Sequence, residues 1–192
     1  MDRTTDQDRR QLDPARTRAQ IMEAALARFA ERGYSGASIG DIAAGAGVPK
    51  SLVQYHFGSK SKLWQSCLQH RAGPMIAAMD GFLSGQGTIE DLLKARIRIH
   101  EEHPELSRLL AWASIEPVPL PTFIQERREA FAGQLLQQGG PPQVAKVFAA
   151  IASIDGWYLF RTLYRTFAGG KMPVVISQEE LLRNAMCVVG QA

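Results

Sequence analysis

The sequence predicts an all-α protein of about nine helices. Apolar residues recur at intervals of three and four through most of the chain, which is the period of an amphipathic helix. Three segments open with Ser or Thr and carry Asp or Glu three residues later, a pattern that caps helix N-termini; they begin at Ser38, Thr88 and Ser177. No alternating apolar and polar run is long enough to predict a strand.

The first helix should begin at Pro14 and end at Gly33. Asp13 suits the capping position, and a proline is tolerated at the first helical position because its missing N–H would have no partner there. Apolar residues then recur every four positions, at Ile21, Ala25 and Phe29. This helix would support the pair that follows it.

Two short helices crossed at a tight turn are expected between Ser38 and Lys60. Ser38 and Asp41 cap the first helix, and Gly47 supplies the positive φ that a sharp corner between helices needs. Pro49 should then occupy the first position of the second helix. With Leu52 and Val53 pointing inward, the outer face carries Lys50, Ser51, Gln54 and Tyr55.

The chemistry of this outer face suits double-stranded DNA. A Gln side chain can pair bidentately with an adenine edge, a Tyr can bind phosphate or stack on a thymine methyl group, and Lys and Ser bind phosphates or bases. No Asp or Glu occurs between Ile42 and Met79, whereas four basic residues fall there. A duplex would therefore meet a surface of one sign.

A longer set of residues at fixed spacings surrounds the helix pair. It comprises the run from Ile21 through Phe29, Gly33-Tyr34, Ile39, Ile42-Ala43, Ala46-Gly47-Val48, Tyr55-His56-Phe57, Ser59-Lys60 and Leu63. This set resembles the N-terminal domain of the TetR family of transcriptional regulators over roughly sixty residues. The resemblance implies a three-helix helix-turn-helix domain that binds a palindromic operator. It also implies an all-helical C-terminal domain that dimerises and binds a small-molecule inducer, and we expect a repressor.

The resemblance further implies which residues contact DNA. Those assigned to phosphate or bases are Ser38, Lys50, Ser51, Tyr55, His56 and Lys60, and the helix geometry adds Gln54. Gln54 stands where many family members have Tyr, and the neighbouring Tyr55 can take over the phosphate contact of that ring. Pro49 replaces the usual Ser or Thr and so removes a hydroxyl that would cap the helix and reach phosphate.

Four parts are expected along the chain. Residues 1–12 are charged and without periodicity, which predicts a disordered arm whose Arg9 and Arg10 could reach a minor groove. Residues 13–58 form the helix-turn-helix domain, 59–73 a connecting helix capped by Ser59, and 74–192 the C-terminal domain. The connecting helix would touch DNA at one end and the C-terminal domain at the other, and we expect it to act as the lever between them.

The C-terminal domain should be helical, with breaks at Gly and Pro. The expected helices cover about 74–83, 88–102, 104–115, 122–138, 142–167 and 177–189. The breaks between them fall at GQG, EPVPLP, Gly139-Gly140 and the segment from Gly169-Gly170 to Pro173.

The last two helices are expected to form a homodimer interface. Residues 142–167 are apolar on more than one side, and several small residues would let a partner helix approach closely. These are Ala149, Ala150, Ala152, Ser153 and Gly156, and the stripe of the final helix is Leu181, Leu182, Ala185, Met186 and Val189. In the resembled family, helices at these places form a four-helix bundle with their copies. The alternative is that both helices fill the core of the monomer.

An inducer pocket is expected among the large apolar residues of the C-terminal domain, for a small apolar ligand. The candidates are Met79, Phe82, Trp112, Phe123, Phe131, Trp157 and Tyr158, with His100, Arg96 or Arg161 as polar contacts. The alternative is that these aromatic residues are core. Asp155 is the one charged residue between Val147 and Leu159, and it could bind inducer, lie at the interface or pair with Arg161.

Composition limits the other classes of function. The net charge of +3 lies wholly in residues 1–64, which hold ten basic and seven acidic residues. Nothing resembles a membrane span or signal peptide, so a cytoplasmic protein is expected. Cys67 and Cys187 are too few for a disulfide scaffold or a zinc site, and redox sensing competes with the simpler role of a small apolar residue.

We expect no catalytic residue, metal or cofactor. His100 and His103 in HEEH have the wrong spacing for a zinc protease, and we interpret them as the polar end of a helix. No catalytic triad or phosphate-binding loop is evident. The alternative functions are an enzyme or a protein-interaction module on a helix-turn-helix scaffold. Turnover would distinguish the first, and folding without DNA binding would distinguish the second.

Overall fold

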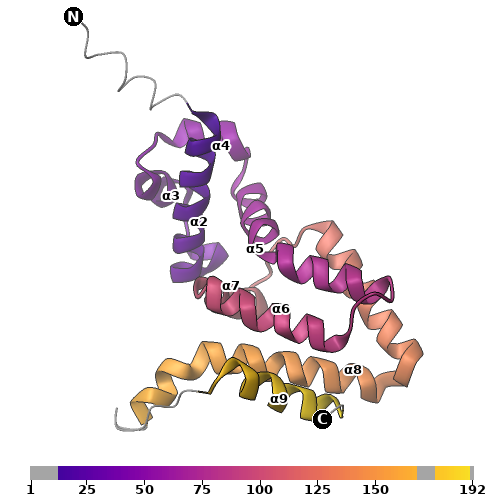
Figure 1. Ribbon diagram of the computed structural model, residues 1–192. Helices are drawn as coiled ribbons and strands as arrows, with labels where there is room; N and C mark the ends of the chain where they lie inside the picture. Colours follow the sequence, from indigo (N-terminus) through magenta and orange to yellow (C-terminus); the bar gives the residue numbers. More distant parts are fainter. Residues whose placement is uncertain (1–12, 168–175, 191–192) are drawn as a thin grey trace, which may run out of the picture. The chain divides into compact units, whose positions relative to one another are not determined.

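Eight α-helices make up the residues that the computed structural model describes, 13–167 and 176–190 (Figure 1). They are α2 (Pro14–Gly36), α3 (Ile39–Ala46), α4 (Lys50–Phe57), α5 (Lys60–Leu83), α6 (Ile89–Glu102), α7 (Glu105–Ile115), α8 (Thr122–Phe167) and α9 (Gln178–Val189). No strand occurs in these residues, which confirms the all-α prediction. The expected arm at 1–12 and the break from Gly169-Gly170 to Pro173 lie outside them.

The helices form two compact units. Unit 1 contains the described residues up to His70 together with Trp112–Pro119. Unit 2 contains Arg71–Ala111 and the described residues from Leu120 onward. Two helices, α5 and α7, therefore have one part in each unit.

In unit 1, α2 begins as expected and ends later than expected. The Asp13 Oδ1 atom accepts hydrogen bonds from the backbone N–H of Ala15 at 3.0 Å and of Arg16 at 3.3 Å, which confirms the cap. Gly33 was predicted to end the helix, but it forms a kink with φ 71° and ψ 179°, and the helix resumes to Gly36. The left-handed φ interrupts the helix for one residue without ending it.

The helix-turn-helix pair follows its sequence signals closely. The Ser38 hydroxyl accepts the Asp41 N–H at 3.0 Å, and Gly47 ends α3 with φ 67° and ψ 30°. Pro49 has φ −62° and ψ 149°, so it is the residue before the helix and not its first helical residue as predicted. Boundaries of this kind are uncertain by one residue from sequence because a proline suits both positions.

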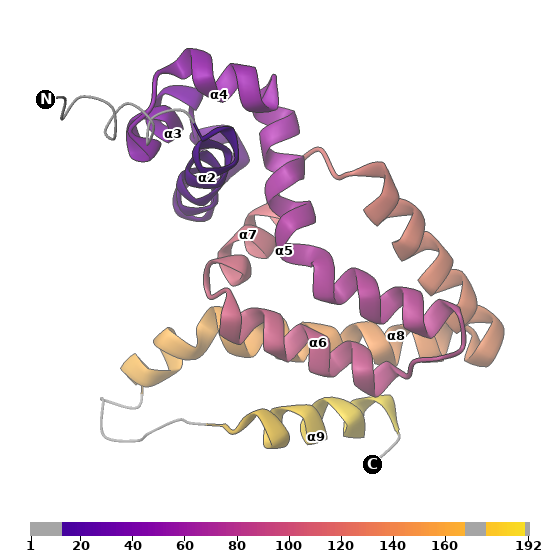
Figure 2. The same ribbon diagram turned by 45° about the horizontal axis from the view of Figure 1, so that its top comes forward.

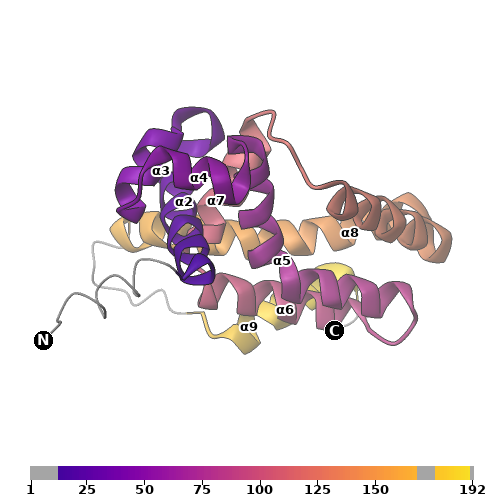
Figure 3. The same cartoon turned by 90° about the horizontal axis from the view of Figure 1, so that it is seen from above.

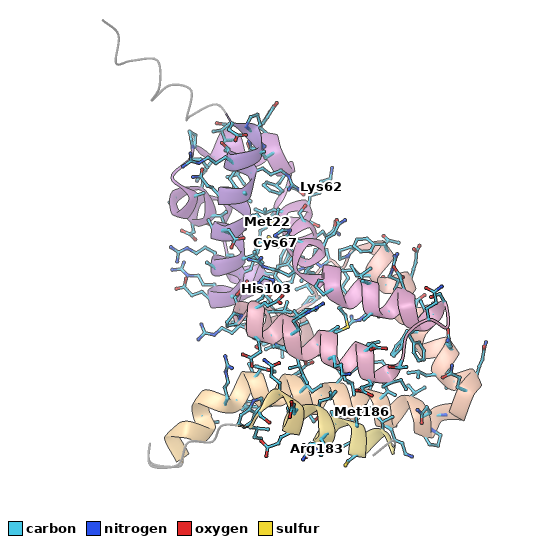
Figure 4. The ribbon with its side chains drawn as sticks, viewed as in Figure 1. Met22, Lys62, Cys67, His103, Arg183 and Met186 are labelled. Carbon is cyan, nitrogen blue, oxygen red and sulfur yellow. The ribbon has the colours of Figure 1, made fainter. Side chains whose placement is uncertain are left out.

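The core of unit 1 is aromatic. The Phe29 and Trp64 rings meet edge to face with centroids 5.0 Å apart, and Tyr34 approaches Trp64 at 5.6 Å. Met22 of α2 and Cys67 of α5 lie side by side in the same unit (Figure 4). Cys67 is fully buried, as expected of a small apolar residue, whereas Cys187 is exposed on α9.

The expected break at Gly73-Pro74 does not occur. α5 runs from Lys60 to Leu83 with Pro74 inside it, and the Ser59 hydroxyl caps it by accepting the Lys62 N–H at 3.2 Å. A proline inside a helix removes one hydrogen bond. The helix continues because Met79 and Phe82 on its later turns are buried in the core of unit 2, which offsets that loss.

The predicted break at Gly139-Gly140 is a kink within α8. Gly140 has φ 68° and ψ −168°, and the two parts of α8 on either side of it run in different directions (Figures 2 and 3). α6 and α9 lie along the second part of α8 (Figure 2). Both capping boxes are confirmed, since Thr88 and Asp91, and likewise Ser177 and Glu180, exchange bonds in both directions.

A polar network lies inside this helical unit. The Arg96 guanidinium binds both Asp155 carboxylate oxygens, at 2.6 and 2.5 Å, and His100 Nε2 lies 2.9 Å from Asp155 Oδ1. His100 Nδ1 lies 2.9 Å from the Ser107 hydroxyl. His100 lies in the last turn of α6 and His103 follows as its C-cap, so both are at the polar end of a helix as interpreted, but His100 is fully buried. A sequence cannot show that α6, α7 and α8 place their polar residues together.

Two environmental effects act on the acid groups of this network. Burial alone would raise the pKa of Asp155, but the hydrogen bonds from His100 and Arg96 outweigh it and leave that pKa below its ordinary value. Burial, and then the hydrogen bond to Glu101, raise the pKa of the Tyr158 hydroxyl. The Tyr158 ring also stacks on His100, with centroids 4.6 Å apart.

We expect Asp155→Asn to lower the free energy of unfolding by about 3 kcal/mol at neutral pH, because Arg96 and His100 would lose their buried carboxylate. Since the folded pKa of Asp155 lies below its ordinary value of 3.8, the contribution is complete above that value and is lost as the pH falls through the folded pKa. Urea unfolding of parent and variant between pH 3 and 7 would therefore show a gap that narrows below about pH 4.

The matched control is Asp80→Asn. Asp80 pairs with Arg127 at 2.7 Å on the surface of the same unit, so its loss should cost less than about 1 kcal/mol. If Asp155→Asn lowers the free energy of unfolding by as little as Asp80→Asn does, or by an amount that does not change with pH, the assignment of the network is contradicted.

Candidate functional site

The outer face of α4 presents the residues predicted to contact DNA. Lys50, Ser51, Gln54 and Tyr55 are all exposed, and Tyr55 is 79% exposed. Val53 and Phe57 are buried on the opposite side, while Leu52, predicted to point inward, is half-buried. Because Val53 and Phe57 lie one turn apart on the buried side of this two-turn helix, the side chains on its opposite side face outward.

The start of α3 and the start of α4 come together at Gly40. A Cβ atom on Gly40 would lie 2.8 Å from Lys50 Cε, 3.0 Å from Lys50 Nζ and 3.5 Å from the Ser38 hydroxyl. The missing side chain thus lets the Lys50 ammonium lie over the N-terminus of α3, beside Ser38. A helix N-terminus with an added cation and hydroxyl favours an anion such as phosphate. No local sequence pattern indicates the close approach of Lys50 to Gly40.

His56 and Lys60 flank this surface at the end of α4 and the start of α5. His56 is half-buried in the last turn of α4. The Lys60 ammonium donates to the Ser35 carbonyl at 3.2 Å and lies 4.6 Å from the centroid of the Tyr34 ring. An ammonium has three donors, so this bond leaves two for another acceptor.

The carboxylates nearest to the helix pair are already paired. Arg28 binds Glu31 at 2.6 Å, and Arg32 lies 3.5 Å from Asp41, which also caps α3 with Ser38. No carboxylate occurs from α4 to the middle of α5, as the sequence states. The potential at the α4 face is consequently set by Lys50 and Lys60, with Lys62 exposed nearby at the start of α5 (Figure 4).

The residues predicted to line an inducer pocket fall into two groups. Met79, Phe82, Phe131 and Tyr158 are buried together in the core of unit 2, and Trp157 packs against that cluster. Phe123, at the start of α8, is half-buried. The Arg127 guanidinium carbon lies over its ring, 5.8 Å from the ring centroid.

Trp112 is placed apart from the other candidates, in unit 1. Its indole N–H donates to the Ala30 carbonyl of α2 at 3.3 Å. Asp155 and two of the expected polar contacts, Arg96 and His100, bind one another in unit 2, and the Arg161 guanidinium lies 5.1 Å from the Tyr158 ring.

A surface pocket of about 600 Å³ opens elsewhere in unit 2, between α5, α6 and α9. None of the predicted aromatic residues lines it. Its walls combine apolar residues, among them Ala77, Ile97 and Leu182, with charged ones such as Lys94, Arg98 and Glu179. Such residues give no sequence signal of a cavity, which explains why it was not anticipated.

The described residues contain no candidate metal centre and no candidate membrane span. Across residues 13–167 and 176–190, no group of three or more His, Cys, Asp or Glu side chains could hold a metal ion. In the same part of the chain, no helix is both long and apolar enough to cross a membrane.

Known proteins resemble this chain in sequence and in fold. Residues 21–67 match the family model described as bacterial regulatory proteins, tetR family. The HTH-type transcriptional repressor SCO4008 of Streptomyces coelicolor is 38% identical over 104 residues, which are 54% of this chain and 53% of that protein. The chain thus spans about half the length of that relative.

Two further proteins resemble more of the chain. The HTH-type transcriptional repressor Rv3405c of Mycobacterium tuberculosis is 29% identical over 84% of both chains. A TetR-like transcriptional regulator from Rhodococcus sp. RHA1 has the same fold, with a TM-score of 0.61 and 18% identity over 91% of this chain and 94% of that one. The matched residues 21–67 contain the helix pair and the exposed α4 face described above. Residues 21–67 thus match the helix-turn-helix domain of the tetR family of bacterial regulatory proteins, and the chain as a whole resembles members of that family.

Proposed function

We propose that the protein is a transcriptional repressor that binds a palindromic operator as a homodimer and leaves it when a small molecule binds unit 2. The observation that carries the proposal is the exposed α4 face, with Lys50, Ser51, Gln54 and Tyr55 on the second helix of a helix-turn-helix. Two relatives named as repressors support the direction of regulation.

The α4 face would lie in the major groove. Gln54 would pair with a base edge and Tyr55 with a phosphate or a thymine methyl group, while Lys50 and Ser51 would contact bases or phosphate. Ser38 and Lys50 converge at Gly40, where a phosphate would meet the N-terminus of α3. His56 and Lys60 would bind the backbone beside it.

The dimer would form through the second part of α8 and through α9. Large apolar side chains are exposed along these helices at Phe148, Leu159, Phe160, Leu163 and Val188. Ala149, Ala152 and Ser153 are exposed among them, and a Cβ atom on Gly156 would meet nothing within 4 Å. An exposed face of large and small apolar residues admits a second copy of the same helices. Two copies would present two α4 helices to half-sites about 34–36 Å apart.

The inducer would bind at the aromatic core of unit 2, formed by Met79, Phe82, Phe131, Trp157 and Tyr158. Phe123, which was predicted with this set, lies under Arg127 instead. The Arg96, His100 and Asp155 network adjoins Tyr158 and would supply the polar contacts. To release DNA, the ligand must bind the DNA-free arrangement more tightly, and a coupling of about 1–3 kcal/mol would be ordinary. Trp112, although predicted with this set, binds the Ala30 carbonyl of α2 instead.

We expect selection from a random pool of duplexes at physiological salt to enrich a palindrome. Gln54→Ala and Tyr55→Ala should each weaken binding to that palindrome by about 1–3 kcal/mol, because each removes a contact to a base or phosphate. Gel-shift titration would measure the loss. Gln69→Ala, an exposed Gln on α5, is the control and should bind as the parent does. Parental affinity for both α4 variants would remove these residues from the interface.

Phosphate contacts should appear in the salt dependence of binding. Lys50→Gln and Lys60→Gln should each reduce the slope of log affinity against log salt by about one per protomer, because each lost contact releases fewer counterions. Lys94→Gln, where Lys94 pairs with Glu90 on α6, should leave the slope unchanged. An unchanged slope for Lys60→Gln would show that Lys60 makes no phosphate contact and binds only the Ser35 carbonyl.

The dimer interface can be tested at a glycine with open space around it. Gly156→Leu should turn the parental dimer into a monomer, because the new side chain would occupy the space of the partner helix without a clash inside its own chain. Gly133→Leu, on the first part of α8 and also with nothing within 4 Å, should remain dimeric. Sedimentation analysis would show both. A monomeric parent, or a dimeric Gly156→Leu variant, would exclude this interface.

A further inference from the structure

The C-terminal end of α4 carries a cation that comes from α2. The Arg18 guanidinium carbon lies 4.8 Å from the centroid of the Phe57 ring, and Phe57 is the last residue of α4. The two helices contact each other within unit 1, and the first turns of α2 lie beside α4 (Figure 1). Arg18 precedes residues 21–67, so the match to the family model does not include it.

Stacking on the ring leaves the hydrogen-bonding edge of this guanidinium free. An Arg that lies over an aromatic ring uses the face of its planar group, and its N–H donors remain available at the edge. Arg18 is exposed, and within residues 13–167 and 176–190 no carboxylate forms an ion pair with it. The ring thus holds the guanidinium in place while its donors stay open to an external anion.

Two further side chains that can bind an anion adjoin the same end of α4. The His56 ring centroid lies 6.5 Å from that of Phe57. Lys62 is exposed, and its Cδ atom would lie 3.7 Å from a Cβ atom on Gly58, the residue that ends α4. We call Arg18, His56 and Lys62 the α4-end cluster. α4 itself contains no acidic residue that would oppose an anion there.

The α4-end cluster lies at the opposite end of the helix from the site where Lys50 and Ser38 meet at Gly40. α4 has eight residues, so its two ends are about 12 Å apart. The major groove of B-DNA is also about 12 Å wide and is bordered by the phosphates of both strands. A helix of this length in the groove can therefore meet one strand at each end.

We infer that Arg18 binds a phosphate on the strand opposite to the one that Lys50 meets. Phe57 positions the guanidinium, and the rest of the α4-end cluster supplies further donors to the same phosphate. This inference rests on the proposed function, and it adds to the DNA interface a residue from outside the helix-turn-helix pair. A contact on each strand would fix the depth and tilt of α4, and these determine which base edge Gln54 reaches.

The first test is the salt dependence of binding to the duplex that the parent selects. Arg18→Gln should reduce the slope of log affinity against log salt by about one per protomer, and it should weaken binding about tenfold at physiological salt. Arg18→Lys keeps the charge and should keep most of the slope. The charge-matched control is Arg28→Gln on the same helix, which should keep the parental slope because Arg28 already binds Glu31 at 2.6 Å.

Thermal unfolding distinguishes a phosphate contact from a purely structural role. If Arg18 only covers Phe57, Arg18→Gln will lower the melting temperature and leave the salt slope unchanged, and this result would overturn the inference. An equal fall in slope for Arg28→Gln would also overturn it, because the effect would then reflect net charge and not a contact.

Neutral phosphates can locate the contact on the duplex. Each phosphate is replaced in turn by a methylphosphonate, which removes its charge. The parent should lose affinity at the phosphate that Arg18 binds, whereas Arg18→Gln should lose little more there, because the contact is already absent. The same series with Lys50→Gln should identify a phosphate on the other strand of the same half-site. Two phosphates on one strand, or none that distinguishes Arg18→Gln from the parent, would overturn the inference.

Failure of the proposed function would be recognised separately. If the parent selects no palindrome, that function fails, and the salt slopes are then measured on a duplex of unrelated sequence, since phosphate contacts do not depend on sequence. A fall in slope for Arg18→Gln but not for Arg28→Gln would still support the contact, and equal slopes would overturn it. A parent that binds no duplex would overturn both.

Discussion

The burial of Val53 and Phe57 determines which face α4 presents to solvent. α4 has only two turns, so fixing one side against the rest of unit 1 fixes the other side toward solvent. Gly47 and Pro49 set the corner from which α4 starts, and Gly40 leaves room for Lys50 across the start of α3. The charged and polar face therefore owes its position to apolar contacts and to the shape of the backbone.

Unit 2 holds charged groups inside its helical core. Asp155 carries a negative charge among apolar helices, and such a group is stable only when it is well paired. Arg96 and His100 supply the partners, and Ser107 extends the chain of bonds to α7. The network links three helices, so any molecule that enters beside Tyr158 would act on all three.

Local sequence signals predicted much of the fold, but they did not predict contacts between residues that are far apart in the sequence. The caps at Asp13, Ser38, Thr88 and Ser177 were identifiable because each involves residues two or three apart. The break predicted at Gly139-Gly140 is a kink in the structure, but the one predicted at Gly73-Pro74 is wrong because burial in the core of unit 2 lets α5 continue through Pro74. The exposed face of α4 followed from the helical period. The partners of Asp155 and Trp112 could not be predicted, since they lie more than fifty residues away.

The shared helices α5 and α7 also have an evolutionary consequence. Unit 1 is not one continuous stretch of sequence, because Trp112–Pro119 complete it after forty-one residues of the other unit. A gene fusion that joined residues up to His70 to a foreign partner would leave the Ala30 carbonyl and the Gly33 backbone without their contacts to Trp112. An exchange of unit 2 for that of another chain would need an incoming unit that brings a residue to fill this place. Residues 112–119 must therefore stay with the first seventy residues for unit 1 to keep all of its parts.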